Sequence, residues 1–159
     1  MTRLRGRAPI GERLVAKVPH GHWKTTTLVA ALDHRGMRCA ITVDGAINQD
    51  LFESFVAKVL VGVLKPGDIV VMDNLSSHKG ATVRALIESI GATVLYLPPY
   101  SPDLNPIEMG FSKIKQLMRS AEHRSREALW SDMQRMLDQI TPSDAQGFFR
   151  HCGYAIEVK

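Results

Sequence analysis

The chain has 159 residues, of which 45% are hydrophobic and 23% charged, as expected for one soluble domain around a single core. No stretch approaches the roughly 20 apolar residues of a membrane span, and the N-terminus lacks the apolar run of a signal peptide; we therefore expect a cytoplasmic protein with no membrane partner. Cys39 and Cys152 do not form a C-x-x-C motif, which predicts two inert, largely buried thiols rather than a zinc or redox site.

The formal net charge of +4 is concentrated at the N-terminus. Residues 1–24 contain one acid, Glu12, and six basic residues: Arg3, Arg5, Arg7, Arg13, Lys17 and Lys24. The segment therefore carries a formal charge of +5, and the rest of the chain carries −1. Basic side chains gain affinity for nucleic acid by releasing counterions from the phosphates. The segment is interpreted either as a DNA-contacting arm, with Arg3, Arg5 and Arg7 as candidate contacts, or as a solvated terminus.

The first predicted elements are a β-hairpin and a helix. Residues 25–32 and 37–43 are rich in apolar and β-branched side chains, and a turn signal at 33–36 separates them. Asn48 can cap the helix that follows, in which apolar residues recur at helical spacing. Lys65-Pro66-Gly67 ends that helix.

The next window is typical of a β-α-β unit. Residues 69–72 form a short apolar run, as expected of a strand covered on both faces, and Asp73 follows it directly. A helix that ends near Gly91 precedes a second strand at 93–97. Because such strands are parallel with a right-handed crossover, the second strand should end at the same sheet edge as Asp73.

A proline-rich loop at 98–105 joins this unit to the C-terminal helices. Asn105 fits a helix N-cap, with Pro106 as the first helical residue and Glu108 in the first turn, at the border of a buried stripe. Glu108 should therefore emerge near the sheet edge described above. A short helix is predicted over 142–150. The helix before it has predicted core positions at Leu129, Trp130, Met133, Met136, Leu137 and Ile140.

Asp73 and Glu108 form the candidate catalytic and metal-binding site. Carboxylates at a sheet edge offer hard oxygen ligands, which suit Mg²⁺ or Mn²⁺ rather than zinc. Phosphodiester chemistry uses two such ions about 3.5–4 Å apart and normally needs further carboxylates. Each residue alone also has an ordinary structural explanation. Asp73 suits a turn after a strand, and Glu108 suits a capping box with Asn105.

Sequence motifs connect the two carboxylates to a known family. The runs Asp73–His78 and Leu97–Glu108, and the 34 residues between Asp73 and Glu108, resemble DDE transposases of the mariner superfamily, in its bacterial insertion-sequence branch. Residues 1–7 and 21–27 also resemble that branch, so the resemblance covers nearly the whole chain. It implies an RNase H-like α/β fold, in which a β-hairpin and parallel strands share a mixed sheet with helices on both faces.

The resemblance also implies an activity and its partners. A complete site of this family would hold two magnesium or manganese ions, cleave DNA strands and transfer them in cut-and-paste transposition. Its DNA partners would be transposon ends and target DNA, bound by a homodimer in a synaptic complex. Asp73 matches the second acid of the family and Glu108 the third. Asn74 and His78 match polar positions near the second acid, where they would support a metal ligand or stabilise the turn.

Two lysines after Glu108 are further candidates for DNA contacts. Lys113 and Lys115 follow it on the same helix, and Lys115 lies two turns along the same face. They would contact phosphates near the active site or belong to an ordinary solvated helix face.

The sequence departs from the family at its start, because the first acid precedes the hairpin in this family and is not found here. Asp33 and Asp44 are typical turn residues at the wrong strand ends. We therefore expect one catalytic domain over residues 1–159 that lacks the first strand and the helix-turn-helix domain, as in an N-terminally truncated transposase. Such a fragment would be inactive or impaired, or alternatively a non-catalytic DNA-binding or inhibitory remnant. Its unpaired strand edges predict aggregation or dimerisation.

Overall fold

The computed structural model describes residues 6–15, 25–123 and 125–156. The predicted hairpin is formed by β1 (Thr26–Asp33) and β2 (Gly36–Asp44), which pair antiparallel. Gly36 has a φ of +123°, and a Cβ at this position would lie 2.8 Å from the carbonyl oxygen of Ile140. Glycine is therefore required here both by the backbone conformation and by the close approach of the C-terminal segment.

The predicted β-α-β unit consists of β3 (Ile69–Met72), α2 (Ala81–Ser89) and β4 (Thr93–Tyr96), and its strands are parallel. Met72 is buried, whereas Ile69 is 66% exposed. On β4, buried Val94 alternates with Leu95, which is 50% exposed. The helices thus cover one face of this pair. The prediction of a strand covered on both faces is wrong, because an apolar run does not reveal which faces have a covering element.

The two strand pairs are separate sheets in the part of the chain that the structure describes. The α/β class, with a hairpin and a parallel pair, is confirmed. The strands do not form one mixed sheet, however, because β1 and β3 are not hydrogen-bonded to each other.

The helix predicted after Asn48 is present but irregular. It begins as α1 (Gln49–Phe55), where the side chain of Asn48 accepts a hydrogen bond from the N–H of Leu51 at 2.9 Å. It continues as a π-helical turn (Val56–Leu60) and a 3-10 turn (Val61–Val63). Together with the β-α-β unit it encloses the first core, which contains Phe52, Phe55, Val56, Leu60, Met72, Val83, Ile87, Ala92 and Val94.

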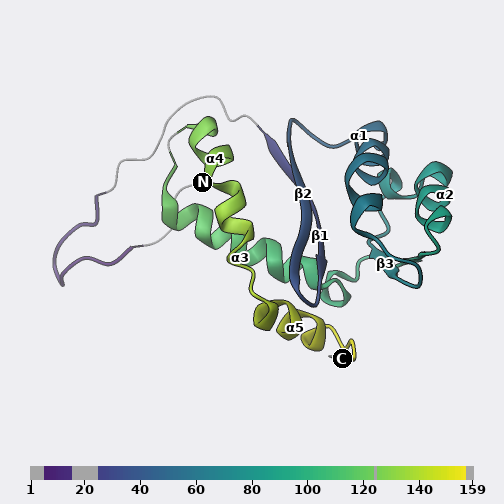
Figure 1. The fold of residues 1–159 in the computed structure, drawn as a ribbon. Coiled ribbons are helices and arrows are strands. Elements are labelled where there is room, and N and C mark those ends of the chain that lie inside the picture. The colour runs from purple at the N-terminus through teal and green to yellow at the C-terminus, as the bar shows by residue number, and fades with distance from the viewer. Residues whose placement is uncertain (1–5, 16–24, 124, 157–159) are drawn as a thin grey trace.

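The C-terminal region consists of α3 (Pro106–Ala121), α4 (Arg126–Leu137) and α5 (Pro142–His151). These helices lie on the side of the hairpin away from α1 and α2 (Figure 1). Trp130 is 39% exposed, and the guanidinium of Arg126 lies 5.1 Å from its ring centroid. The predicted core position of Trp130 is therefore wrong: the residue lies near the start of α4, where Arg126 covers the ring. The second core contains buried Ile114, Met133, Leu137 and Ile140.

The hairpin is the middle layer of the molecule, because its alternate side chains contribute to both cores. Val29, Ala31, Cys39 and Ile41 pack against the first core. Leu28, Leu32, Met37 and Ala40 pack against the second. Helices therefore cover both faces of the hairpin, as predicted.

Two predictions from composition concern the thiols and the membrane. Cys39 is half-buried and Cys152 is buried, and both are free. Burial raises the pKa of both thiols, which agrees with the expected inert character. None of the helices in the described ranges is long and apolar enough to cross a membrane.

Candidate active site

Asp73 directly follows β3, at the C-terminal edge of the parallel pair. Its Oδ1 accepts a hydrogen bond from the N–H of Leu75 at 3.2 Å, so Asp73 does hold the turn after the strand. The same oxygen lies 2.6 Å from Nδ1 of His78. Oδ2 has no partner among the described residues. One oxygen is therefore used by the structure, and the other is available to a ligand.

His78 is held beside Asp73 by packing. Its ring lies 4.1 Å from the ring of Phe52, centroid to centroid, and its backbone carbonyl accepts a hydrogen bond from the Tyr96 hydroxyl at 2.9 Å. The short approach of Nδ1 to Asp73 is an ion-pair contact that is not aligned as a hydrogen bond, and Nδ1 has no hydrogen-bond partner in the described chain. The structure thus brings His78 into contact with the predicted metal ligand.

Glu108 lies in the first turn of α3. Asn105 is the N-cap and Pro106 the first helical residue, as predicted, but the Asn105 side chain makes no capping hydrogen bond. The carboxylate of Glu108 has no hydrogen-bond or ion-pair partner within the described ranges. The capping box considered from the sequence is therefore not formed. The side chain of Glu108 is exposed.

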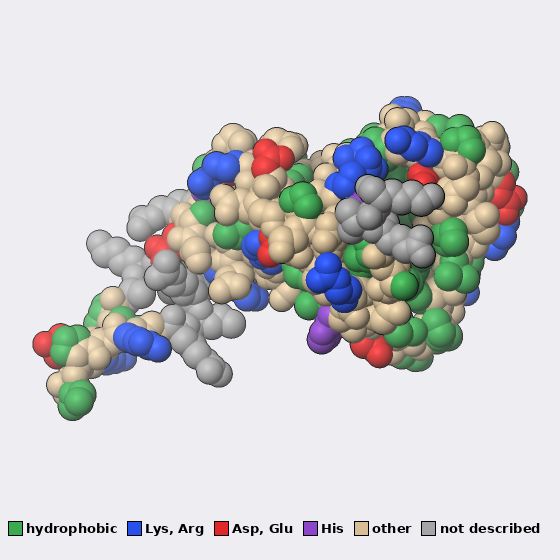
Figure 2. Space-filling model, turned by 60° about the horizontal axis from the view of Figure 1, so that its bottom comes forward, with side chains coloured by type: hydrophobic (Ala, Val, Ile, Leu, Met, Phe, Trp, Pro, Cys, Tyr) green, Lys and Arg blue, Asp and Glu red, His purple; other side chains and the backbone are tan. Residues whose placement is uncertain are grey.

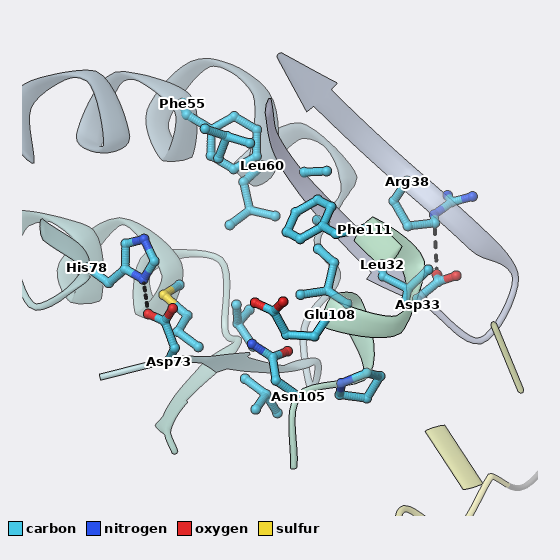
Figure 3. Close-up of a pocket in the computed structure, with 18 of the residues that line it drawn as sticks. Leu32, Asp33, Arg38, Phe55, Leu60, Asp73, His78, Asn105, Glu108 and Phe111 are labelled. Carbon is cyan, nitrogen blue, oxygen red and sulfur yellow. Dashed lines mark ion pairs between the residues drawn. The ribbon is translucent and has the colours of Figure 1, made fainter. Parts of the chain in front are cut away.

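Asp73 and Glu108 line the same cavity, which has a volume of about 500 Å³ and lies between β1 and β3. Figure 3 shows both side chains in this space, Asp73 joined to His78 by the marked ion pair and Glu108 near Phe111. The two carboxylates come from elements that are far apart in the sequence. The prediction that they share one region of the molecule agrees with this geometry.

A second cavity adjoins the first. This loop groove, of about 380 Å³, is lined by Asp73–Leu75, Leu97–Pro102, Asn105 and Glu108. Four of its residues also line the larger cavity: Asp73, Leu75, Asn105 and Glu108. The groove therefore opens beside the two carboxylates. Asn74, which was predicted to support Asp73, is half-buried in its wall.

The oxygen donors of Asp73 and Glu108 fit the requirements of a divalent cation. Mg²⁺ is commonly bound through one or two carboxylates, with waters and substrate phosphates as the other ligands. Oδ2 of Asp73 and the carboxylate of Glu108 match this pattern, because both oxygen donors are without structural partners in the described chain. The described residues contain no group of three or more His, Cys, Asp or Glu side chains that could hold a metal.

The other acids weighed as ligands are both ion-paired, although Asp33 also lines the larger cavity. Asp33 forms ion pairs with Arg35 at 2.6 Å and Arg38 at 3.2 Å, at the end of the hairpin. Asp44 lies 2.6 Å from Arg126. Both are ion-paired residues at strand ends, which agrees with the turn positions predicted for them.

The candidate DNA contacts differ in their surroundings. Lys113 binds Asp144 at 2.7 Å, so its charge connects α3 to α5, whereas Lys115 is exposed. Arg7 is also exposed, and Arg3 and Arg5 lie outside the described residues. Figure 2 shows Lys and Arg side chains spread over the visible face rather than gathered in one patch.

Tyr100 was not singled out from the sequence, where it is only one residue of a stiff loop. In the structure its φ is +58° and its side chain is fully exposed, at the edge of the loop groove. The one sequence signal is negative: Tyr100 belongs to no periodic apolar pattern that would bury it.

Known proteins resemble this chain in sequence and in fold. Residues 1–130 match the family model for the DDE superfamily endonucleases. The structure matches a Mos1 transposase paired-end complex with the left transposon end, with a TM-score of 0.72 and 18% identity over 96% of this chain and 47% of that chain. It also matches the catalytic domain of Mos1 mariner transposase, with a TM-score of 0.61 and 20% identity over 80% of this chain and 67% of that chain. No curated protein matches the chain.

The structural matches confirm the RNase H-like fold, and the family model confirms the DDE superfamily. The chain spans about half the length of the Mos1 protein in the paired-end complex. The family model covers most of the sequence, up to residue 130. The chain therefore belongs to the DDE superfamily of endonucleases.

Proposed function

We propose that this chain is a single catalytic domain of a DDE transposase, which cleaves DNA strands and transfers them with the help of Mg²⁺ or Mn²⁺. One observation carries the proposal. Asp73 and Glu108 line one cavity, and each offers carboxylate oxygen that has no hydrogen-bond or ion-pair partner in the described chain. Membership of the DDE endonuclease superfamily supports the same reaction.

Asp73 and Glu108 would hold the metal in this proposal. In a complete site two divalent ions would be expected, and the chemistry they would supply is activation of the attacking water or 3′-hydroxyl and stabilisation of the leaving oxygen. Structures of the Mos1 catalytic domain with Mg and with Mn, at 18% and 19% identity, support the choice of ion.

The neighbouring residues prepare the two carboxylates. The N–H of Leu75 and the ring of His78 both engage Oδ1 of Asp73, so the carboxylate cannot rotate freely and Oδ2 is presented to the ligand. Glu108 lies at the start of a helix, where the helix dipole favours its negative charge. His78, and Asn74 beside it, are proposed to position Asp73 rather than to contact the reacting atoms.

The DNA partner is proposed to include transposon ends and target DNA, bound by a homodimer in the cytoplasm. The related Mos1 structures include a paired-end complex with a transposon end and a strand transfer complex, which supports a DNA substrate. Lys115 and Arg7 are the described candidates for phosphate contacts, since both are exposed. Arg3 and Arg5 extend this proposal beyond the described residues, whereas Lys113 would first have to leave Asp144.

Nicking of supercoiled plasmid DNA with Mn²⁺ tests the proposal. Wild-type chain should nick weakly, because the described residues supply no third metal ligand, and Asp73→Asn and Glu108→Gln should each abolish this nicking. The matched control is Asp44→Asn, which removes an exposed carboxylate paired with Arg126 and should leave nicking unchanged. Nicking that survives Asp73→Asn would contradict the assignment.

A second candidate function is a DNA-binding remnant without catalysis. The specific observation in its favour is that the described residues lack a third metal-ligating side chain at the site. Salt-dependent DNA binding by wild-type chain without metal-dependent nicking would support this alternative. Mn²⁺ titration by electron paramagnetic resonance separates the two functions further. A catalytic domain should bind Mn²⁺ and lose this binding in Asp73→Asn, whereas for a remnant Asp73→Asn should not change Mn²⁺ binding.

A further inference from the structure

Tyr100 has two unfavourable properties for a residue of an isolated fold. Its φ of +58° lies in the left-handed region, which is uncommon for a bulky side chain. Its side chain has an exposure of 102%, so the ring gains no burial. Strained backbone of this kind is concentrated at functional sites. Both properties are expected of a residue whose ring contacts a ligand.

The loop holds Tyr100 on a rigid support. Pro98, Pro99 and Pro102 restrict the backbone on both sides of it. Beyond it, residues 102–104 form a 3-10 turn, and the carbonyl of Leu104 accepts a hydrogen bond from the hydroxyl of Tyr154 at 2.8 Å. The backbone that carries the exposed ring is therefore restrained beside the candidate-site cavity.

The loop groove next to Tyr100 suits an uncharged, flat group. Of the described residues that line it, none is Lys, Arg or His and two are carboxylates, so these residues offer a phosphate no cationic partner. Leucine and proline side chains provide apolar walls. Asn74 and Asn105 are half-buried, and their side chains make no hydrogen bond within the described ranges. Two unused amides beside apolar walls can pair with the edge of a base.

We propose that Tyr100 and the loop groove bind an unpaired nucleobase of the DNA strand that passes Asp73 and Glu108. The Tyr100 ring stacks on the face of the base, and Asn74 and Asn105 contact its edge. The groove is continuous with the cavity through four shared residues, so the base lies next to the phosphodiester at the carboxylates. This inference rests on the proposed function, because it names the part of a DNA substrate that the site takes.

The test uses a short single-stranded oligonucleotide that contains 2-aminopurine, whose fluorescence is quenched when the base stacks. Tyr100→Asn is the informative variant, because asparagine tolerates the left-handed conformation and only the ring is lost. We expect its Kd to rise about tenfold and the change in 2-aminopurine fluorescence to disappear. Tyr100→Phe should bind within about twofold of wild type, because stacking needs the ring and not the hydroxyl.

The matched control is Trp130→Ala, which removes an exposed aromatic ring on α4 and should not change the Kd. The inference is overturned if Tyr100→Asn binds and changes the fluorescence like wild type, or if wild type binds no oligonucleotide. Thermal unfolding of Tyr100→Asn confirms that the variant is folded. If nicking requires Asp73 but stacking does not require Tyr100, only this inference fails. If stacking requires Tyr100 but nicking survives Asp73→Asn, only the proposed reaction fails.

Discussion

The two strand pairs of this molecule are covered in different ways. The hairpin has a core on each face, and its strands contribute alternate side chains to both. The β3–β4 pair has its helices on one face, and its other face leaves Leu95 half exposed. Glu108 begins a helix that packs on the well-covered hairpin, whereas Asp73 ends a strand of the thinly covered pair. The candidate site therefore joins two regions that are covered to different extents.

The largest effects are expected in the cores. Ile87, in the first core, and Ile114, in the second, are 0% and 1% exposed. Ile87→Ala and Ile114→Ala should each lower the free energy of unfolding by about 2–5 kcal/mol, because each leaves a cavity. Since the hairpin belongs to both cores, urea unfolding followed by circular dichroism should show one transition for either variant. Two separate transitions would mean that the hairpin does not couple the cores.

Gly36 tests the close contact between the hairpin and the C-terminal region. Gly36→Ala places a methyl group 2.8 Å from the carbonyl oxygen of Ile140, at a φ of +123°. We expect a loss of about 1–3 kcal/mol of unfolding free energy. The control is Gly45→Ala, which has a positive φ but no atom within 4 Å of its Cβ. If both variants lose the same stability, the contact with Ile140 contributes nothing beyond backbone strain.

The two carboxylates should differ in stability while agreeing in activity. Asp73→Ala removes the hydrogen bond to the N–H of Leu75 and the contact with His78, and should cost about 1 kcal/mol. Glu108→Ala removes a side chain without a partner in the described chain, and should change stability by less than about 0.5 kcal/mol. Thermal unfolding without metal measures both. Equal losses would show that Glu108 has a structural role that its contacts do not reveal.

The local elements could be predicted from the sequence because their signals are local. Asn48 caps its helix, Pro106 begins another, and strand-like runs mark the hairpin and the β-α-β unit. Which faces are covered could not be predicted, because this depends on elements distant in sequence. Trp130 fits a helical apolar stripe but lies beyond the core, beside Arg126.

The candidate site shows the same limit. The placement of Asp73 and Glu108 on one cavity followed from strand order and helix start, which the sequence indicates. That the Glu108 carboxylate has no partner in the described chain could not be predicted. Asn105 and Glu108 also match a capping box, which the structure does not form. The exposure of Tyr100 depends on its left-handed backbone, for which an aromatic residue gives no signal.

The smallest expected effect is on the pH dependence of stability, through the ion pair between Lys113 of α3 and Asp144 of α5. Hydrogen bonds from Lys113 and Thr141 lower the pKa of Asp144 to about 2, from an ordinary value of 3.8. Because the folded-state pKa is the lower one, the stabilisation is complete above pH 3.8 and is lost as the pH falls toward 2. Asp144→Asn should therefore flatten the fall in melting temperature over this range. Asp138→Asn, at an exposed acid bound by neutral Gln134, is the control and should keep the wild-type slope. An unchanged slope in Asp144→Asn would show that the contact between α3 and α5 does not depend on this charge.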